Sequence, residues 1–355
     1  MNGAFTGALG QAWPPFVLVT GLLLIGLAVA SDGLFEAAGS RIARLPGGGL
    51  SLFAALMGMV AAVTAVLNLD TSVVFLTPIL VHAARRRGIN EIAFLYGAVF
   101  MSNSASLLLP GSNLTNLLVL SHSHSSGSAF AAQLFPSWIA AIVVTSGVVL
   151  VWRWSDLRVP ETGREVVAPF RPGPGLPAVL VAAVLVLTLR NPAVPVLVLG
   201  MVAATIQVAR RGRLEARGAL RSIGAPTLVG LFALVVALGT LARSWGAPGR
   251  LMASIGVWPA ALLGAGTADA VNNLPAAALL ASRPPAHPEA LLIGLDLGPN
   301  LVVTGALSAM LWMRIARHEG GKPSAWTYTK VGVVLVPISV AAALGALQLL
   351  VHGSA

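Results

Sequence analysis

Long apolar runs separated by short polar loops make up most of the chain. Most of these runs approach or exceed the about 20 residues that an α-helix needs to cross a bilayer. The predicted spans lie at about 13–31, 92–120, 133–152, 175–189, 193–209, 224–242, 290–315 and 331–351. Residues 1–12 lack a basic start, so we expect the first run to be a spanning helix rather than a signal peptide.

Two further apolar stretches, 50–83 and 251–282, are longer than one span and are interrupted by polar residues. A single crossing by 50–83 would put Arg85–Arg87 on the opposite side from Arg41 and Arg44. A re-entrant hairpin enters and leaves on one side, so it puts these basic clusters on the same face. We therefore predict two hairpins that enter from opposite faces. Two short spans in each stretch would give the same loop sides, so that alternative stays open.

The basic residues gather in loops that this topology places on one face. Of the 22 Lys and Arg residues, all but Arg190, Arg243, Arg250 and Arg283 fall in five segments. These segments are 41–46, 85–90, 153–173, 210–222 and 314–330. Because excess Lys and Arg marks the cytoplasmic side, we predict these loops inside, both termini outside and a location in the plasma membrane. The net charge of +10 is then a topology signal, and we expect no nucleic-acid partner.

Composition agrees with a polytopic membrane protein. The chain has 355 residues, of which 56% are hydrophobic and 10% charged, and its mean hydropathy is +0.85. A soluble domain carries far more charge. Cys is absent, which excludes disulfides and thiolate metal sites. We expect an all-α protein with no metal and no cofactor, and we expect it not to be an enzyme because no nucleophile–base pair stands out.

The chain divides into two halves of similar plan. A polar, Pro-rich segment, 153–175, is predicted to be a cytoplasmic linker between repeats at 1–152 and 176–355. Each repeat has a hairpin followed by a broken helix, at 92–120 and at 290–315. The stretch "LLLPGSNLTNLLVL" in the first broken helix is similar to "LDLGPNLVVTGALS" in the second. Inverted-topology repeats with Gly- and Pro-interrupted helices are typical of secondary transporters.

Four polar breaks interrupt the hairpins and the broken helices. They are "NLDTS" (68–72), "SNSAS" with "PGSNLTN" (102–116), "TADAVNN" (267–273) and "DLGPN" (296–300). Irregular backbone at mid-membrane depth must be buried in protein or line a watery cavity, so we predict that the breaks converge on one central site. The candidate substrate ligands are Thr71, Ser72, Asn103, Asn113, Thr115, Asn116, Asn272, Asn273, Asn300 and Thr304. The candidate proton- or ion-coupling residues are Asp70, Asp269 and Asp296.

A purely structural role is the alternative for each of these side chains. Asp, Asn, Ser and Thr are preferred helix N-caps, and polar contacts between membrane helices are common. The acids favour function more strongly, because an ionisable group inside the bilayer costs about 2.5–3.5 kcal/mol or more. A Ser would cap a helix at lower cost, so Asp70 and Asp269 are the stronger functional candidates.

The sequence at the breaks resembles that of a known family. "LDTSVVFLTPIL", "SNSASLLLPGSNLTNLLVLSH", "VNNLPAAALL" and "LDLGPNLVVTGALSAMLW" are similar to the arsenical-pump membrane proteins of the ion-transporter superfamily. That superfamily also contains sodium/proton antiporters and sodium-coupled symporters of divalent anions. The resemblance implies two inverted repeats with re-entrant hairpins, efflux of arsenite and antimonite against protons, a possible homodimer and a possible soluble ATPase partner. Leu69 departs from the Asn that the family typically has before the hairpin Asp, and we expect the chain to lack the family's first one or two helices.

Three transport functions therefore remain open. The first is arsenite or antimonite efflux, in which a neutral hydroxylated solute is held by hydrogen bonds. The second is a sodium-coupled symporter of dicarboxylate or sulfate, which the absence of a mid-span Lys or Arg disfavours. The third is a sodium/proton antiporter, in which Asp70 and Asp269 would serve equally well.

Overall fold

The structure is a computed structural model of residues 1–355, described at all positions except 1, 123–125, 159–171, 212–224 and 354–355. The described residues form helices and contain no strand. The first half forms α1 (Asn2–Ser31), α2 (Leu34–Ile42), α3 (Gly49–Val66), α4 (Leu69–Arg86), α5 (Ile92–Ala105), η1 (Pro110–Ser112), α6 (Leu114–Leu120), α7 (Gly127–Trp152) and α8 (Trp154–Leu157). The second half forms α9 (Gly175–Thr188), α10 (Ala193–Arg211), α12 (Ala225–Trp245), α13 (Ala247–Met252), α14 (Val257–Val271), α15 (Asn273–Leu280), α16 (Pro288–Leu297), η2 (Gly298–Asn300), η3 (Val303–Gly305), α17 (Leu307–His318) and α18 (Ala325–Gly353).

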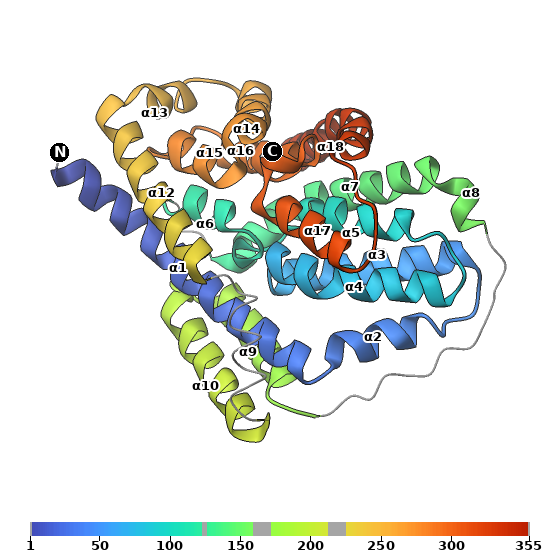
Figure 1. Ribbon diagram of the computed structural model, residues 1–355. Helices are drawn as coiled ribbons and strands as arrows, with labels where there is room; N and C mark the ends of the chain where they lie inside the picture. Colours follow the sequence, from blue (N-terminus) through green and yellow to red (C-terminus); the bar gives the residue numbers. More distant parts are fainter. Residues whose placement is uncertain (1, 123–125, 159–171, 212–224, 354–355) are drawn as a thin grey trace.

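The fold confirms an all-α membrane protein. Among the described helices, six are long and apolar enough to cross a bilayer. Both predicted broken helices are broken: 92–120 consists of α5, η1 and α6, and 290–315 consists of α16, η2, η3 and α17. The order of a hairpin and then a broken helix recurs in both halves (Figure 1). The inverted relation between the halves, and the boundaries drawn at 152 and 176, stay predictions.

The first predicted span was too short. Helix α1 begins at Asn2 rather than near residue 13 and continues through Pro14 and Pro15. Its early turns bury Ala8 and Ala12. The polar Gln11 is tolerated there because its amide donates to the carbonyls of Leu118 and Ala281, each at 2.9 Å.

The short helix α2 was not predicted either. It is amphipathic and buries Phe35, Ala37, Gly39 and Ser40. The Phe35 ring stacks on Phe75 of α4 at a centroid distance of 5.6 Å. Helix α2 therefore lies along the first hairpin instead of crossing the membrane, and its polar face hid it from a search for apolar runs.

Three of the five basic segments, 41–46, 85–90 and 314–330, contact one another at one face of the molecule. Arg87, at the end of α4, donates to the carbonyls of Ala43 at 2.6 Å and Gly47 at 2.5 Å. Arg85 donates to the carbonyl of Glu319 at 2.8 Å. The start of α3 and the end of α4 are thus on the same face, as predicted for a hairpin.

The second hairpin opens at the opposite face. The amide of Ala286, beyond the end of α15, donates to the carbonyl of Met252, before the start of α14, at 3.0 Å. Arg243 donates to Gln11 near the N-terminus of α1 at 2.5 Å. The N-terminus therefore lies on this less basic face (Figure 1). Helix α18 starts at the basic face, where Ser324 bonds Tyr96, and then runs away from it.

This arrangement predicts labelling of opposite faces in a chain without native Cys. A maleimide that cannot cross membranes should label Arg250→Cys in intact cells and Arg85→Cys only after permeabilisation, because the positive-inside rule puts the Arg85 face in the cytoplasm. Mass shifts of the purified variants measure the labelling. Reaction of Arg85→Cys in intact cells would contradict the predicted orientation.

Candidate functional site

The tips of the two hairpins and the two broken helices meet around one small cavity. It is lined by Leu69, Asp70, Asn113, Leu114, Leu231, Asn272, Asn273, Leu274, Ala306, Leu307 and Ser308. The hairpins enter from opposite faces, yet both tips line this cavity, so each hairpin ends inside the protein. In the first hairpin α3 and α4 have 18 residues each, whereas in the second hairpin α14 has 15 residues and α15 only eight. The convergence favours re-entrant hairpins over pairs of short spans.

The cavity is narrow in this conformation. Its volume of about 30 Å³ is room for one or two water molecules. The polar lining side chains are Asp70, Asn113, Asn272, Asn273 and Ser308, and the described lining contains no Lys, Arg or His. The cavity therefore offers amide, hydroxyl and carboxyl groups and no cationic side chain.

The first hairpin tip places Asp70 at this cavity. Asn68 precedes α4, and its side-chain oxygen accepts from the Thr71 amide at 2.7 Å. The helix is thus capped by Asn68, so Asp70 is not needed as the cap. Within the described part of the chain, the Asp70 carboxylate accepts no hydrogen bond. The N-terminus of α4, with its positive partial charge, begins at the same place.

The second hairpin tip holds a strained residue. Asn272 has φ 80° and ψ 147°, and among the described residues it is the one non-glycine with positive φ. That conformation costs about 1–3 kcal/mol. Two contacts hold it: its Nδ2 donates to the Thr304 carbonyl at 3.0 Å, and its Oδ1 accepts from the Leu274 amide at 3.4 Å. The tip is therefore tied to the second broken helix.

Asp269 lies one turn before this tip. Its Oδ1 is buried and has no hydrogen-bond partner among the described residues. A methyl group added at Gly305 would lie 3.1 Å from this oxygen, so the carboxyl faces the η3 break of the second broken helix. An unpartnered buried carboxyl oxygen is costly, which agrees with a group that exchanges a ligand or a proton.

Asp296 sits deeper, at the break of α16, and is engaged on both oxygens. Its Oδ1 accepts from Asn113 at 2.8 Å and from Thr115 at 2.7 Å. Its Oδ2 accepts from Ser106 at 3.1 Å. The carboxylate therefore ties the second broken helix to the first, and it does not line the cavity.

A second polar link joins the same two helices. Asn103 donates to Asn300 at 2.9 Å and accepts from Ser308 at 3.1 Å. Asn300 in turn donates to Ser104 at 3.2 Å. All four side chains are buried. Side-chain hydrogen bonds thus connect the two halves directly behind the cavity.

Of the 13 predicted site residues, four line the cavity and nine lie outside the described lining, Asp269 among them. The cavity lining contains Asp70, Asn113, Asn272 and Asn273, and their functional roles stay predictions. Thr71, Ser72, Asn103, Thr115, Asn116, Asp296 and Asn300 are buried outside the described lining. Thr304 is an exposed residue, and it contacts the second hairpin tip through its backbone carbonyl.

The structure adds residues that were not predicted. Ser308 lines the cavity and Ser106 binds Asp296. Both stand in stretches that carried the family resemblance, so the motifs pointed to them without singling them out. Within the described residues, no group of three or more His, Asp or Glu is placed to hold a metal ion.

Comparisons with known proteins point to membrane transport. Residues 3–295 match the family model described as CitMHS, citrate transporter. The chain is 27% identical to an arsenical pump membrane protein of Escherichia coli, over 95% of this chain and 86% of the relative. It is 28% identical to a 46 kDa membrane protein of Mycobacterium leprae, over 94% and 85%.

A solved structure agrees on the fold. The YdaH transporter of Alcanivorax borkumensis matches with a TM-score of 0.62 at 15% identity, over 99% of this chain and 88% of that chain. The arsenical-pump relatives agree with the resemblance seen in the break motifs. The family match extends from α1 into α16 and so includes both hairpins, and the chain therefore belongs to the CitMHS family of citrate transporters.

Proposed function

We propose that this chain exports arsenite or antimonite in exchange for protons. This proposal rests on the cavity lining, which offers Asn, Ser and Asp side chains and no described cationic side chain. Arsenite near neutral pH is mostly the uncharged As(OH)₃, whose hydroxyls can be held by amide, hydroxyl and carboxyl groups. The chain has no Cys, so thiolates cannot hold the metalloid. The arsenical pump names of several relatives support the same substrate.

Asp70 and Asp269 are the proposed proton carriers. No described residue donates a hydrogen bond to Asp70 or to the Asp269 Oδ1, whereas Asp296 accepts three. A carboxyl that takes up and releases a proton in each transport cycle must not be held by permanent hydrogen bonds. Asp296, which accepts three, therefore serves better as a fixed link between the two halves. In this proposal the strained tip at Asn272 and the Asp70 tip move apart to admit the solute, because about 30 Å³ cannot hold it.

Sodium-coupled anion symport is the second candidate. The family description, citrate transporter, favours it. The N-termini of α4 and α15 begin at the cavity, and helix N-termini attract anions. A carboxylate substrate would nevertheless approach Asp70 with no described cationic side chain in the lining to offset the repulsion.

Transport in proteoliposomes separates these candidates. With an imposed pH gradient, we expect uphill movement of arsenite and antimonite and no movement of citrate. With an imposed Na⁺ gradient alone, we expect neither. Citrate uptake that depends on Na⁺ would replace the proposal with the symporter. Sodium movement driven by the pH gradient without any arsenite movement would replace it with the antiporter.

A matched variant links the assay to the cavity. Ser308→Ala removes a hydroxyl that lines the cavity and bonds Asn103. We expect the apparent affinity for arsenite to fall about fivefold to tenfold, since one hydrogen bond contributes about 1 kcal/mol. Ser339→Ala is the control, because among the described residues Ser339 bonds only its own helix, at the Val336 carbonyl. If Ser308→Ala and Ser339→Ala have the same apparent affinity for arsenite, Ser308 does not belong to the substrate site.

A further inference from the structure

A second, larger pocket lies at the basic face, away from the transport cavity. It is lined by Ile89, Asn90, Glu91, Ile92, Leu95, Tyr96, Trp152, Arg153, Gly320, Lys322 and Thr327, and its volume is about 560 Å³. The volume falls within the range of about 300–1,000 Å³ that small-ligand sites have. The lining comes from the start of α5, the end of α7, the loop between α17 and α18 and the first turn of α18. None of these residues lines the transport cavity.

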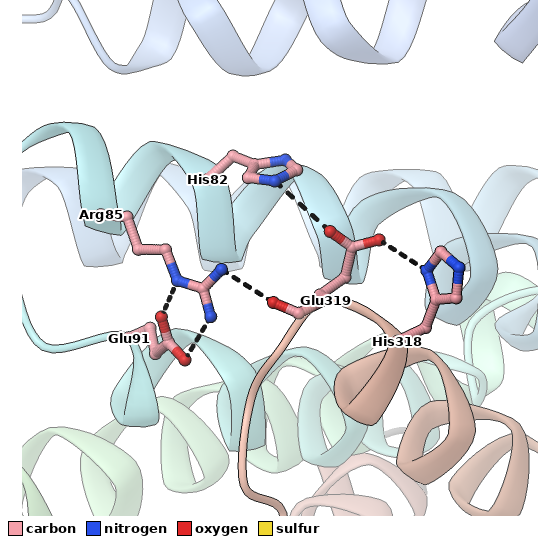
Figure 2. A network of polar contacts seen from close by, with 5 residues as sticks. All are labelled: His82, Arg85, Glu91, His318 and Glu319. Carbon is pink, nitrogen blue, oxygen red and sulfur yellow. Dashed lines mark hydrogen bonds and ion pairs between the residues drawn. The ribbon is translucent and has the colours of Figure 1, made fainter.

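The charge of the pocket is positive once its ion pairs are counted. Glu91 is the one acid in the described lining, and Arg85 holds it through both carboxylate oxygens (Figure 2). Arg85 is itself fixed by the Glu319 carbonyl at 2.8 Å. The Glu91 charge is therefore already compensated from outside the pocket.

Lys322 supplies the uncompensated positive charge of the lining, and Arg153, whose charge Asp156 balances, keeps one N–H donor without an acceptor. Lys322 is exposed and forms no ion pair with any described residue. Arg153 bonds Asp156 through one terminal nitrogen, but its Nε is buried and has no hydrogen-bond partner in the described part of the chain. A buried donor without an acceptor costs about 1–3 kcal/mol. An acceptor oxygen that reached this Nε would remove that cost.

The walls of the pocket suit the membrane interface. The guanidinium of Arg153 lies 5.4 Å from the centre of the Trp152 ring, and Tyr96 packs edge-on against the same ring at 5.4 Å. Trp and Tyr gather at the headgroup level of bilayers. Val151 and Trp326, the chain neighbours of two lining residues, are 76% and 66% exposed. Apolar surface thus lies next to the pocket on α7 and α18, where acyl chains would run.

We propose that this pocket binds the headgroup of an anionic phospholipid of the phosphatidylglycerol type. Lys322 and the Arg153 Nε take the phosphate oxygens, and Asn90 and Thr327 are the polar side chains available to the glycerol hydroxyls. Basic pockets between membrane helices are known to bind such headgroups. The headgroup would then bridge the α7 end, the α5 start and the loop before α18. A free phosphate shares the charge but lacks the acyl chains that Val151 and Trp326 would contact.

Lipid titration of the purified protein tests this proposal. Native mass spectrometry of the full chain in detergent should show tighter binding of phosphatidylglycerol than of phosphatidylcholine. Lys322→Gln and Arg153→Gln should each weaken phosphatidylglycerol binding about fivefold, because a basic residue near an anionic lipid contributes about 1 kcal/mol. Lys330→Gln is the matched control: Lys330 lies near the same face but stacks on Trp326 at 5.3 Å, outside the pocket lining.

The thermal midpoints of both variants in phosphatidylcholine must match that of the wild type, which shows that the variants are folded. If Arg153→Gln misfolds, Lys322→Gln alone tests the proposal. Equal affinity for the two lipids, or an unchanged affinity in Lys322→Gln, would overturn the proposal. Competition by millimolar inorganic phosphate that fully displaces the lipid would identify a free-anion site and would also overturn it.

Discussion

Asp269→Asn should fold and insert normally but reduce pH-gradient-driven arsenite transport to the level of protein-free liposomes. Asn keeps the volume of the side chain and can still accept hydrogen bonds, but it cannot carry a proton. If Asp269 is a proton carrier, the variant should still exchange substrate across the membrane without a gradient. Asp70→Asn should behave in the same way, since Asn68 rather than Asp70 caps α4.

The measurement is radiolabelled arsenite movement in proteoliposomes, with and without an imposed pH gradient. Asp156→Asn is the control, because Asp156 is an acid paired with Arg153 at the basic face and far from the cavity lining. If both the Asp269 and Asp70 variants concentrate arsenite at the wild-type rate, these acids have only a structural role. Loss of downhill exchange as well would mean that they bind substrate rather than protons.

The hairpins could be predicted because their evidence is local in the sequence. Each basic cluster identifies its own face, and the contact of Arg87 with Ala43 and Gly47 confirms that two clusters meet. The breaks were visible for the same reason, since Asn, Asp and Pro stand out in an apolar run. The meeting of Asp70 with Asn272 at one cavity followed from opposite entry of the hairpins.

Partners distant in the sequence could not be predicted in this way. Asp32 follows an apolar run and has the appearance of a loop residue, yet it is 2% exposed. It accepts from the Gly175 amide at 2.8 Å and from Gln207 at 2.6 Å, and so fixes the start of α9 to the end of α1. Asp296 was expected at the cavity, but its three donors come from a helix about 180 residues earlier. No pattern within one span reveals which donor a buried carboxylate will find.

Gly294→Ala should prevent stable packing of the second broken helix and abolish transport. Helices α14 and α16 pack backbone to backbone, and a Cβ at Gly294 would lie 2.0 Å from the Ala261 carbonyl oxygen. Gly298, one turn later, would meet the Ala265 backbone at 2.6 Å. Small residues spaced four apart allow such close approach between membrane helices. A clash with backbone cannot be relieved by a rotamer change, so α16 must shift, and Asp296 shifts with it.

Gly266→Ala gives a matched comparison on the same pair of helices. Gly266 is in α14, and nothing lies within 4 Å of a Cβ built there. Alanine favours the helix over glycine by about 1 kcal/mol, so this variant should keep its transport rate and its thermal midpoint should stay equal or rise. We expect Gly294→Ala to lower the free energy of unfolding by about 3 kcal/mol, the upper end of the cost of overpacking a buried site. This loss should appear as a smaller yield of monodisperse protein after detergent extraction. If Gly294→Ala keeps wild-type stability but loses transport, the loss comes from displacement of the Asp296 link alone. Wild-type stability with wild-type transport would contradict the close α14–α16 contact, because that contact leaves no space for a methyl group.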